Sequence, residues 1–338
     1  MPNPDVTMRD VYKARQKIAA IATRTPLISS PWLTELVGAC VYLKLECLQK
    51  TGSFKIRGAA NKMVSLTADE RERGVITVSS GNHGRAVSYV ARQLGIKAVI
   101  CMSARVPSNK VEAIRHLGAE TVVYGKSYDE AEKHALRLWE ERGLTMIDPF
   151  DDPLVIAGQG TIGLELLGDL PEIDTVIVPV GGGGLISGIA LALKSANSGN
   201  RVIGVQMDRA PVMYHSLRAG ALITMEEEET IADALAGNIA LNNQYTFRMI
   251  QGYVDDVVLV SDEEIAASMA FALEKHHLVV EGGGAVGIAA LLYRRVREVG
   301  RNVVAVVSGS SVGLPLLLKV AQAHGGGEVD PSWSKSCK

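Results

Sequence analysis

The stretch TVIVPVGGGGLISG, residues 175–188, runs from an apolar, β-branched segment through four consecutive glycines into a helical pattern. Consecutive glycines expose backbone N–H groups with no side chain in the way, and the dipole of the following helix favours an anion there. A merely flexible loop would rarely lie so tightly between a strand and a helix. The stretch therefore predicts a strand–loop–helix unit of an α/β fold, with a phosphate group bound at Gly181–Gly184.

Similar units recur along the chain. Apolar runs without alternation are typical of strands that are buried on both faces of a parallel sheet. Eight runs are predicted as strands: Val41–Leu45, Val75–Val78, Ala98–Cys101, Thr121–Val123, Thr175–Val178, Arg201–Val205, Val257–Val260 and Val303–Val307. Helices are predicted over 128–142, 263–276 and 287–299, with capping boxes at Thr67 and Ser261. This alternation of strands and helices predicts an α/β fold with right-handed crossovers.

Composition narrows the class of function. The 338 residues suffice for one large or two medium domains, because single cores stop growing near roughly 250–300 residues. A net charge of −2 gives no attraction to nucleic acid or to an anionic membrane. No apolar run approaches the roughly 18 residues of a membrane helix, and the four cysteines form no CxxC pair. We therefore expect a cytoplasmic protein with free thiols that acts on a small molecule.

The stretch KTGSFKIRGA, residues 50–59, contains a candidate catalytic lysine. A lone lysine near a loop is usually a solvated surface charge. Lys55, however, follows an apolar Phe54 and a Gly/Ser turn, which suits a partly buried amine with a lowered pKa. Such an amine can form a Schiff base with a carbonyl cofactor.

Two further stretches follow predicted strands. SSGNHGR, residues 79–85, opens a helix that is predicted to run to about Leu94. The free N–H groups of a helix start suit a substrate carboxylate, although a capped turn would have the same local pattern. SGSS, residues 308–311, follows the strand 303–307, at the sheet edge where ligands of open α/β folds gather.

Together, these stretches resemble the serine/threonine dehydratase and serine racemase family of fold-type II pyridoxal-phosphate (PLP) enzymes. The resemblance extends from about Thr25 to about Leu318, with the motifs in family order, and is strongest to the dehydratase of hydroxyectoine utilisation. It implies a tryptophan synthase β-like fold with two open twisted sheets flanked by helices. A large PLP-binding domain would comprise residues 1–73 and 152–338, and a small mobile domain residues 74–151. The resemblance also implies a homodimer.

The resemblance assigns roles to individual residues. Lys55 would hold PLP as a Schiff base and later move the α-proton, and Ser80 would be an acid/base group on the opposite face of the cofactor. The other implied cofactor contacts are Phe54 beside the ring, Asn82 at the phenolic oxygen, Ser308 at the pyridine nitrogen, and Gly181, Gly182, Gly183, Gly184 and the Leu185 amide at the phosphate. The substrate carboxylate would be held by Ser79, Ser80, Gly81, Asn82 and His83.

The implied reaction is β-elimination from a 3-hydroxy amino acid, which yields a 2-oxo acid and ammonia in amino-acid catabolism. Threonine, serine or a hydroxylated diaminobutyrate derived from hydroxyectoine are the candidate substrates. Two alternatives remain open. The protein could be a racemase, because Lys55 and Ser80 offer acid/base groups on both cofactor faces, or a non-catalytic ligand-binding protein on the same scaffold.

Several positions depart from the family pattern. Ser310 and Ser311 replace Gly-Asn after Ser308, and Arg85 replaces a common glutamine. The stretch after Glu281, GGG at residues 282–284, replaces Pro-Ser-Gly and could admit a different substrate side chain, and Ala234 replaces a common glycine.

Two further patterns are decoys. Gln206 and Val212 stand where cation-binding members have acidic residues, so we expect no metal. The glycines at 282, 284 and 287 fit a dinucleotide fingerprint, but the next predicted strand ends in Ser308 rather than in an acidic residue. We therefore expect no NAD site.

Overall fold

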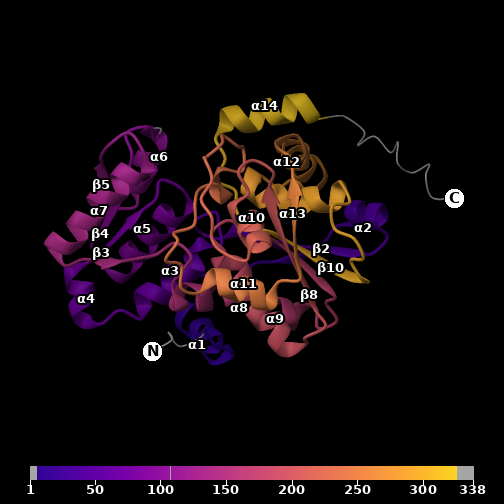
Figure 1. Ribbon diagram of the computed structural model, residues 1–338, viewed down its shortest axis with the longest axis horizontal. Coiled ribbons are helices and arrows are strands. Elements are labelled where there is room, and N and C mark those ends of the chain that lie inside the picture. Colours follow the sequence, from indigo (N-terminus) through magenta and orange to yellow (C-terminus); the bar gives the residue numbers. More distant parts are fainter. Residues whose placement is uncertain (1–5, 107, 326–338) are drawn as a thin grey trace.

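The computed structural model describes residues 6–106 and 108–325, which form two β-sheets flanked by helices (Figure 1). A six-stranded sheet has the order β1-β2-β10-β7-β8-β9, and a four-stranded sheet has the order β5-β4-β3-β6. The strands are β1 Leu27–Ser29, β2 Cys40–Leu45, β3 Val75–Val78, β4 Ala98–Met102, β5 Glu120–Val123, β6 Thr145–Met146, β7 Thr175–Pro179, β8 Arg201–Met207, β9 Asp256–Val260 and β10 Asn302–Val307. The predicted α/β fold with two open sheets is thus confirmed.

All eight predicted strands are present, and their ends differ from the prediction by at most two residues. Strands β3, β4, β7 and β10 are buried along their whole length, which explains why they read as continuous apolar runs. Two short strands were not predicted. Strand β1 pairs antiparallel with β2 at one sheet edge, and the two-residue β6 pairs parallel with β3. Neither is long enough to give a periodic signal.

The helices are α1 Met8–Ile18, α2 Pro31–Val37, α3 Lys55–Val64, α4 Ala68–Arg73, α5 Asn82–Leu94, α6 Ser108–His116, α7 Tyr128–Arg142, α8 Pro153–Asp169, α9 Gly184–Ala196, α10 Val212–Ala219, α11 Thr246–Tyr253, α12 Asp262–His276, α13 Gly282–Leu292 and α14 Leu314–His324, with 3-10 turns η1 Glu46–Leu48 and η2 Asp233–Leu235. The capping boxes at Thr67 and Ser261 are confirmed. No helix in the described ranges is long and apolar enough to cross a membrane.

The helix predicted over 287–299 is wrong in its bounds, because α13 begins five residues earlier and ends at Leu292. Its glycine-rich first turn packs directly on neighbouring backbone. An added Cβ at Gly282 would lie 2.1 Å from the Ile231 carbonyl oxygen, and one at Gly284 would lie 2.6 Å from the Gly309 carbonyl oxygen. This close packing outweighs the low helix propensity of glycine. Beyond the helix end, Arg294 has a φ of 50°, which is incompatible with a continuing helix.

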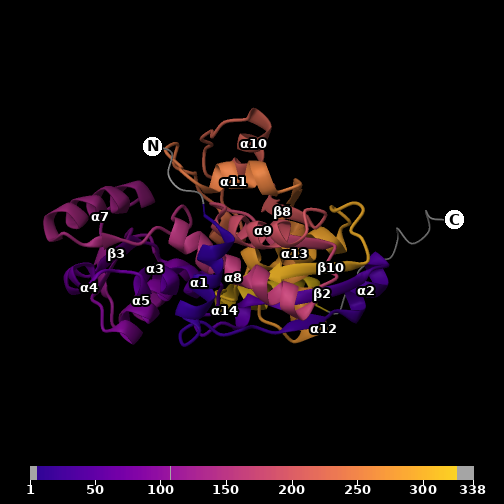
Figure 2. The same cartoon turned by 90° about the horizontal axis from the view of Figure 1, so that it is seen from below.

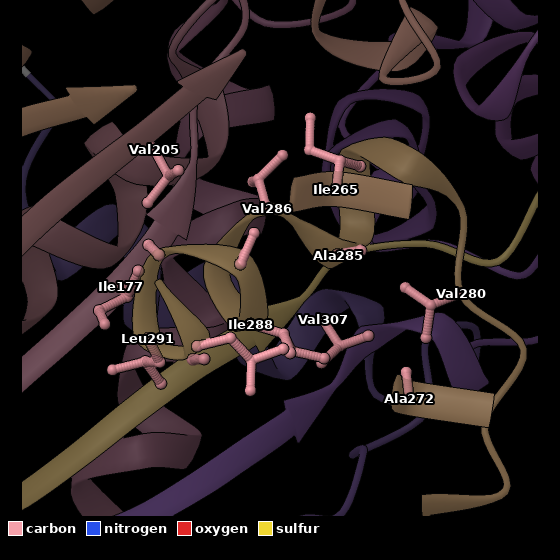
Figure 3. Packing of buried hydrophobic residues seen from close by; sticks show 14 of the residues in the cluster. Ile177, Val205, Ile265, Ala272, Val280, Ala285, Val286, Ile288, Leu291 and Val307 are labelled. Atoms are coloured by element: carbon pink, nitrogen blue, oxygen red, sulfur yellow. The ribbon is translucent and has the colours of Figure 1, made fainter. Parts of the chain in front are cut away.

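Helix α13 is buried along its whole length against the six-stranded sheet. Figure 3 shows its side chains Val286, Ile288 and Leu291 packed beside Ile177 of β7 and Val307 of β10. Helices α8 and α9 lie side by side in both views (Figures 1 and 2). The core thereby fixes β7 and β10, whose carboxyl ends carry the predicted cofactor loops.

A buried charge cluster fixes the helix that begins with Lys55. The Arg57 guanidinium on α3 contacts the Glu46 carboxylate at 2.8 Å and the Glu165 carboxylate on α8 at 2.6 Å. The Lys44 amine on β2 lies 2.6 Å from the Glu165 carboxylate. Two cations thus face two carboxylates away from solvent, and together they join α3 to both β2 and α8.

Candidate active site

Lys55 is the first residue of α3 and is held next to the segment that follows β10. The Phe54 amide donates to the Ser308 carbonyl oxygen at 3.1 Å, and the Ser310 amide donates to the Gly52 carbonyl oxygen at 2.9 Å. Gly52 has a φ of 77°, which a residue without a Cβ adopts most readily. The turn before α3 therefore places the segment that carries Lys55 next to Ser308.

The Lys55 amine is directed into a partly apolar environment. It donates to the Pro149 carbonyl oxygen at 2.7 Å and lies 5.3 Å from the centroid of the Phe54 ring. Burial lowers the pKa of Lys55 to about 8, while the carboxyl groups of Asp148 and Glu281 act in the opposite direction. About a tenth of this amine is therefore neutral, and nucleophilic, at pH 7, far more than for a lysine with its ordinary pKa.

The tetraglycine loop between β7 and α9 is a cradle that side chains would fill. An added Cβ at Gly182 would lie 2.3 Å from the Phe150 ring, and one at Gly184 would lie 2.8 Å from the Phe150 carbonyl oxygen. Gly183 has a φ of 92°, and a Cβ there would lie 2.7 Å from Ile250. No side chain caps α9, so the amides of its first turn have no acceptor within the helix. Such a helix start suits an anion.

The loop that joins β6 to α8 connects the lysine to this cradle. Its Pro149 carbonyl accepts from Lys55, and the next residue, Phe150, lies against Gly182 and Gly184. The Asp151 carboxylate accepts from the amides of residues 244–246 at the start of α11, which packs against Gly183. The predicted Schiff-base lysine and the predicted phosphate loop are thus parts of one site.

The predicted carboxylate-binding turn, residues 79–83, follows β3 and leads into α5. Ser79, Ser80 and Gly81 are partly exposed, and α5 begins at Asn82 without a side-chain cap. The buried His83 ring donates from Nε2 to the Ile147 carbonyl oxygen at 3.0 Å. Burial, assisted by Lys55, lowers the pKa of His83 to about 3, so the ring stays neutral. What His83 can offer a substrate is its backbone rather than its imidazole.

Asn82 opens α5 after β3 of the four-stranded sheet, and Ser308 directly follows β10 of the six-stranded sheet. The Asn82 Nδ2 donates to the Glu281 Oε1 at 2.6 Å, whereas the buried Asn82 Oδ1 has no hydrogen-bond partner in the described part of the chain. The Ser308 hydroxyl donates to the Gly283 carbonyl oxygen over a long 3.3 Å. Both side chains therefore keep hydrogen-bonding capacity for a ligand.

Two of the departures from the family pattern contact each other. The Arg85 guanidinium donates to the Ser311 hydroxyl at 3.0 Å. The Ser310 hydroxyl is turned the other way and lies 3.1 Å from the Cys47 carbonyl oxygen and 3.2 Å from that of Gly52. Ser310 therefore supports the turn before Lys55, and Ser311 belongs to the contact with α5.

The decoy motifs have structural uses. The amide oxygen of Gln206 accepts from the Tyr214 backbone at 3.0 Å. Within residues 6–106 and 108–325, no three His, Cys, Asp or Glu side chains form a group that could hold a metal ion. The glycines at 282 and 284 serve the close packing of α13 described above.

Comparison with known proteins decides the family. A family model described as pyridoxal-phosphate dependent enzyme matches residues 18–309. The chain belongs to this family.

Members of this PLP-dependent family resemble the chain over almost all of its length. It is 44% identical over 315 residues to an L-threonine ammonia-lyase of Thermotoga maritima, covering 93% of this chain and 78% of the relative. It is 41% identical to the L-threonine dehydratase catabolic TdcB of Staphylococcus aureus, covering 97% and 95%. A maize serine racemase structure superposes with a TM-score of 0.89 at 36% identity, covering 95% and 98%. The protein is a PLP-dependent lyase.

The residues present fit the cofactor of this family. The tetraglycine cradle and the uncapped start of α9 suit its phosphate, because they offer N–H groups where side chains would collide. The Lys55 amine suits its aldehyde. The buried Asn82 amide oxygen has no hydrogen-bond partner in the described residues, so a bound ligand could supply one.

Sequence reasoning missed three parts of the site: Glu281, Asp148 and the Pro149–Phe150 pair. Glu281 was considered as the residue before a glycine-rich stretch and, with His276 and His277, as a rejected metal group. Burial raises the pKa of its carboxyl to about 7, although the hydrogen bonds from Asn82 and Ser311 lower it. The loop residues follow the short β6, which gave no strand signal, so nothing in the sequence marked that loop as the end of a strand.

Proposed function

We propose that this lyase eliminates water from a 3-hydroxy amino acid, and that the released enamine is then hydrolysed by water to a 2-oxo acid and ammonia. The observation that carries the proposal is the Lys55 amine, whose pKa is lowered to about 8 beside the tetraglycine cradle. Relatives named L-threonine ammonia-lyase and L-threonine dehydratase support threonine as substrate. Serine and a hydroxylated diaminobutyrate derived from hydroxyectoine share the 3-hydroxyl group and are the other candidates.

Each predicted residue has a distinct task in this reaction. When bound, the cofactor supplies an electron sink for the pair left at the substrate α-carbon. Lys55 removes the α-proton, and the resulting ammonium group is an acid that can protonate the departing β-hydroxyl. The backbone amides at the start of α5, between Ser79 and His83, bind and orient the substrate carboxylate.

The remaining residues hold the cofactor. Gly181–Gly184 and the Leu185 amide would hold its phosphate, with Phe54 beside the ring and Asn82 at the ring oxygen. A serine hydroxyl, such as that of Ser308, is a neutral partner for the pyridine nitrogen. It leaves that nitrogen largely uncharged, which favours prompt elimination over a long-lived carbanion.

Closure of a small domain, residues 74–151, over the large domain, residues 1–73 and 152–338, is part of the proposal. The four-stranded sheet lies within the small segment, and two hydrogen bonds join α5 to the segments around β10, namely Asn82 to Glu281 and Arg85 to Ser311. Exclusion of water protects the reactive product before its release.

The direct test is an assay of 2-oxo acid and ammonia release from L-threonine, L-serine and the hydroxylated diaminobutyrate. Replacement of Lys55 by Ala should abolish release. The matched control is Lys62→Ala at the other end of α3, where the amine pairs with Asp152 at 2.6 Å. This control should retain activity. Absence of product from every candidate with the unmodified holoenzyme would refute the proposal.

Racemisation is the second candidate activity, because Ser80 is partly exposed in the turn before α5 and could serve the face opposite Lys55. Recovery of inverted substrate with solvent deuterium at the α-carbon would establish it. A ligand-binding protein without catalysis would show no cofactor absorbance band, even after PLP is added.

We also propose that two copies associate in the cytoplasm. Helix α14 supports association, because it exposes the apolar Leu314 and Leu318 and buries only Val320. The free thiols of Cys40, Cys47 and Cys101 are consistent with a reducing compartment. Sedimentation of the purified holoenzyme and fractionation of cells test these two statements.

A further inference from the structure

The Glu281 carboxyl joins three segments at the site. Glu281 is the residue that precedes α13, and its backbone amide donates to the Gly309 carbonyl oxygen at 3.1 Å. Its Oε1 accepts from the Asn82 Nδ2 at 2.6 Å, and its Oε2 accepts from the Ser311 amide at 3.2 Å. The side chain thus links the start of α5 with the segment after β10.

We propose that Glu281 is a positioning residue that acts through Asn82: it fixes the orientation of the Asn82 amide and so sets the hydrogen bond that this amide offers to the ring oxygen of the cofactor. The inference rests on the proposed function, in which Asn82 faces that oxygen. An amide nitrogen has two N–H groups. Because Glu281 accepts from one of them, the nitrogen is held in place and its second N–H remains for the ligand.

Close packing leaves Glu281 little freedom to move. An added Cβ at Gly309 would lie 2.0 Å from the Glu281 Oε1 and 3.3 Å from the Asn82 Nδ2. A glycine at 309 is therefore required for the contact between the carboxylate and the amide. Glu281 is only 4% exposed, so water does not compete for its oxygens. A supporting group held this firmly can orient a ligand-binding side chain precisely.

The charged state of Glu281 depends on the groups around it. Four titratable groups act on it from the elements around it. The Lys55 amine comes from α3, the Cys47 thiol from η1, the Asp233 carboxyl from η2 and the Lys110 amine from α6. Burial, with a smaller contribution from Asp233, raises the pKa of Glu281 to about 7, although the hydrogen bonds from Asn82 and Ser311 and the charge of Lys110 act to lower it. On protonation, the carboxyl loses acceptor capacity toward Asn82. Cofactor binding should therefore weaken as the pH falls through about 7.

The first experiment compares holoenzyme of the unmodified protein with Glu281→Gln and Glu264→Gln. Glu264 is the matched control, because it is also a buried glutamate near a helix start, where it caps α12 and pairs with Arg295. The readouts are the PLP dissociation constant and the pH titration of its absorbance band. A lost charged hydrogen bond should weaken PLP about ten-fold or more in Glu281→Gln. It should also remove the step in the pH dependence near 7 and leave only the dependence that the Lys55 amine sets near 8. Glu264→Gln should lower only the thermal midpoint.

The second experiment tests whether Glu281 acts through Asn82. In an Asn82→Ala background, Glu281→Gln should change the PLP dissociation constant by less than about two-fold, because the mediating amide is gone. A further ten-fold loss in that background would overturn the inference, as would an unchanged dissociation constant and band titration in the single variant. If Glu281→Gln does not fold, Glu281→Asp is measured instead, since it keeps the charge but shortens the reach.

Activity separates this inference from the proposed function. Glu281→Gln should lower kcat about ten-fold with a smaller change in KM, because the substrate carboxylate is held elsewhere. Absence of oxo-acid product with the unmodified holoenzyme would refute the proposed reaction. The PLP dissociation constant and band titration require no substrate, so they would still decide the role of Glu281.

Discussion

Replacement of Arg57 by Met tests the buried charge cluster that fixes α3. The Arg57 side chain is 2% exposed and contacts the Glu46 and Glu165 carboxylates, which are 0% and 10% exposed. Without Arg57, the Glu46 carboxylate keeps hydrogen bonds from Thr25 at 2.5 Å and Gln49 at 3.2 Å, but it has no direct cation partner. Removing one partner of a buried ion pair costs about 3–5 kcal/mol.

We therefore expect Arg57→Met to lower the free energy of unfolding by about 3–5 kcal/mol in urea titrations at pH 8. The control is Arg142→Met. Arg142 pairs with Glu120 at 3.0 Å, but both side chains are about half exposed, at 45% and 51%. Such a surface pair contributes at most about 1 kcal/mol. Equal losses in the two variants would refute the energetic role of the cluster.

The pH dependence gives a second check. Burial alone would raise the pKa of Glu46, but the Arg57 guanidinium and the hydrogen bonds from Arg57 and Thr25 bring it below the unfolded value of 4.5. A carboxyl with a lowered pKa stabilises the fold above its unfolded pKa and loses this contribution as pH falls through the folded pKa. The difference between Arg57→Met and the unmodified protein should therefore shrink below about pH 4.5. A difference that is equal at pH 8 and pH 4 would contradict this account.

Three further perturbations test the site. Gly183→Ala should weaken PLP binding and lower stability by about 1–3 kcal/mol, because the residue has a φ of 92° and its Cβ would meet Ile250 at 2.7 Å; Gly220→Ala, at a φ of 71° in open space, controls for the strain alone. The rate at which PLP recombines with the cofactor-free protein should rise with pH and level off above about 8, the pKa of Lys55, because only the neutral amine attacks the aldehyde. A rate that is flat between pH 6 and 9 would contradict this. Ser311→Ala removes the acceptor of the Arg85 guanidinium and should alter the ratio of kcat/KM values among the three candidate substrates several-fold. This size corresponds to the roughly 1 kcal/mol of one partly exposed hydrogen bond. An unchanged ratio would exclude that contact from substrate selection.

The sequence was most informative where local pattern and burial coincide. Strands β7 and β10 are buried on both faces, so their apolar runs mark their ends almost to the residue. The tetraglycine loop was likewise readable as the link of a strand–loop–helix unit, because β7 precedes it and α9 begins within it. The glycine-rich start of α13 could not be read in this way, since its backbone packs on Ile231 and Gly309, which are distant in sequence.

Contacts between distant segments account for what the sequence could not predict. Asn82 and Glu281 are 199 residues apart, and no periodic pattern relates them. The Pro149 carbonyl that accepts from Lys55 is a backbone group, which every residue type provides. Prediction from pattern therefore found the candidate site residues that lie in local motifs, and missed those that only tertiary contact brings beside them.

The departures from the family pattern are physically coupled in pairs. Arg85 and Ser311, both unusual, contact each other at 3.0 Å. Gly283 stands where the family more often has serine, and an added Cβ there would lie 3.2 Å from the Cβ of Ala234, which stands where glycine is common. The methyl group of Ala234 therefore fills space that a side chain at 283 would need. Within each pair, one member thus supplies the hydrogen bond or the volume that the other member's position would otherwise lack, so these departures compensate each other locally.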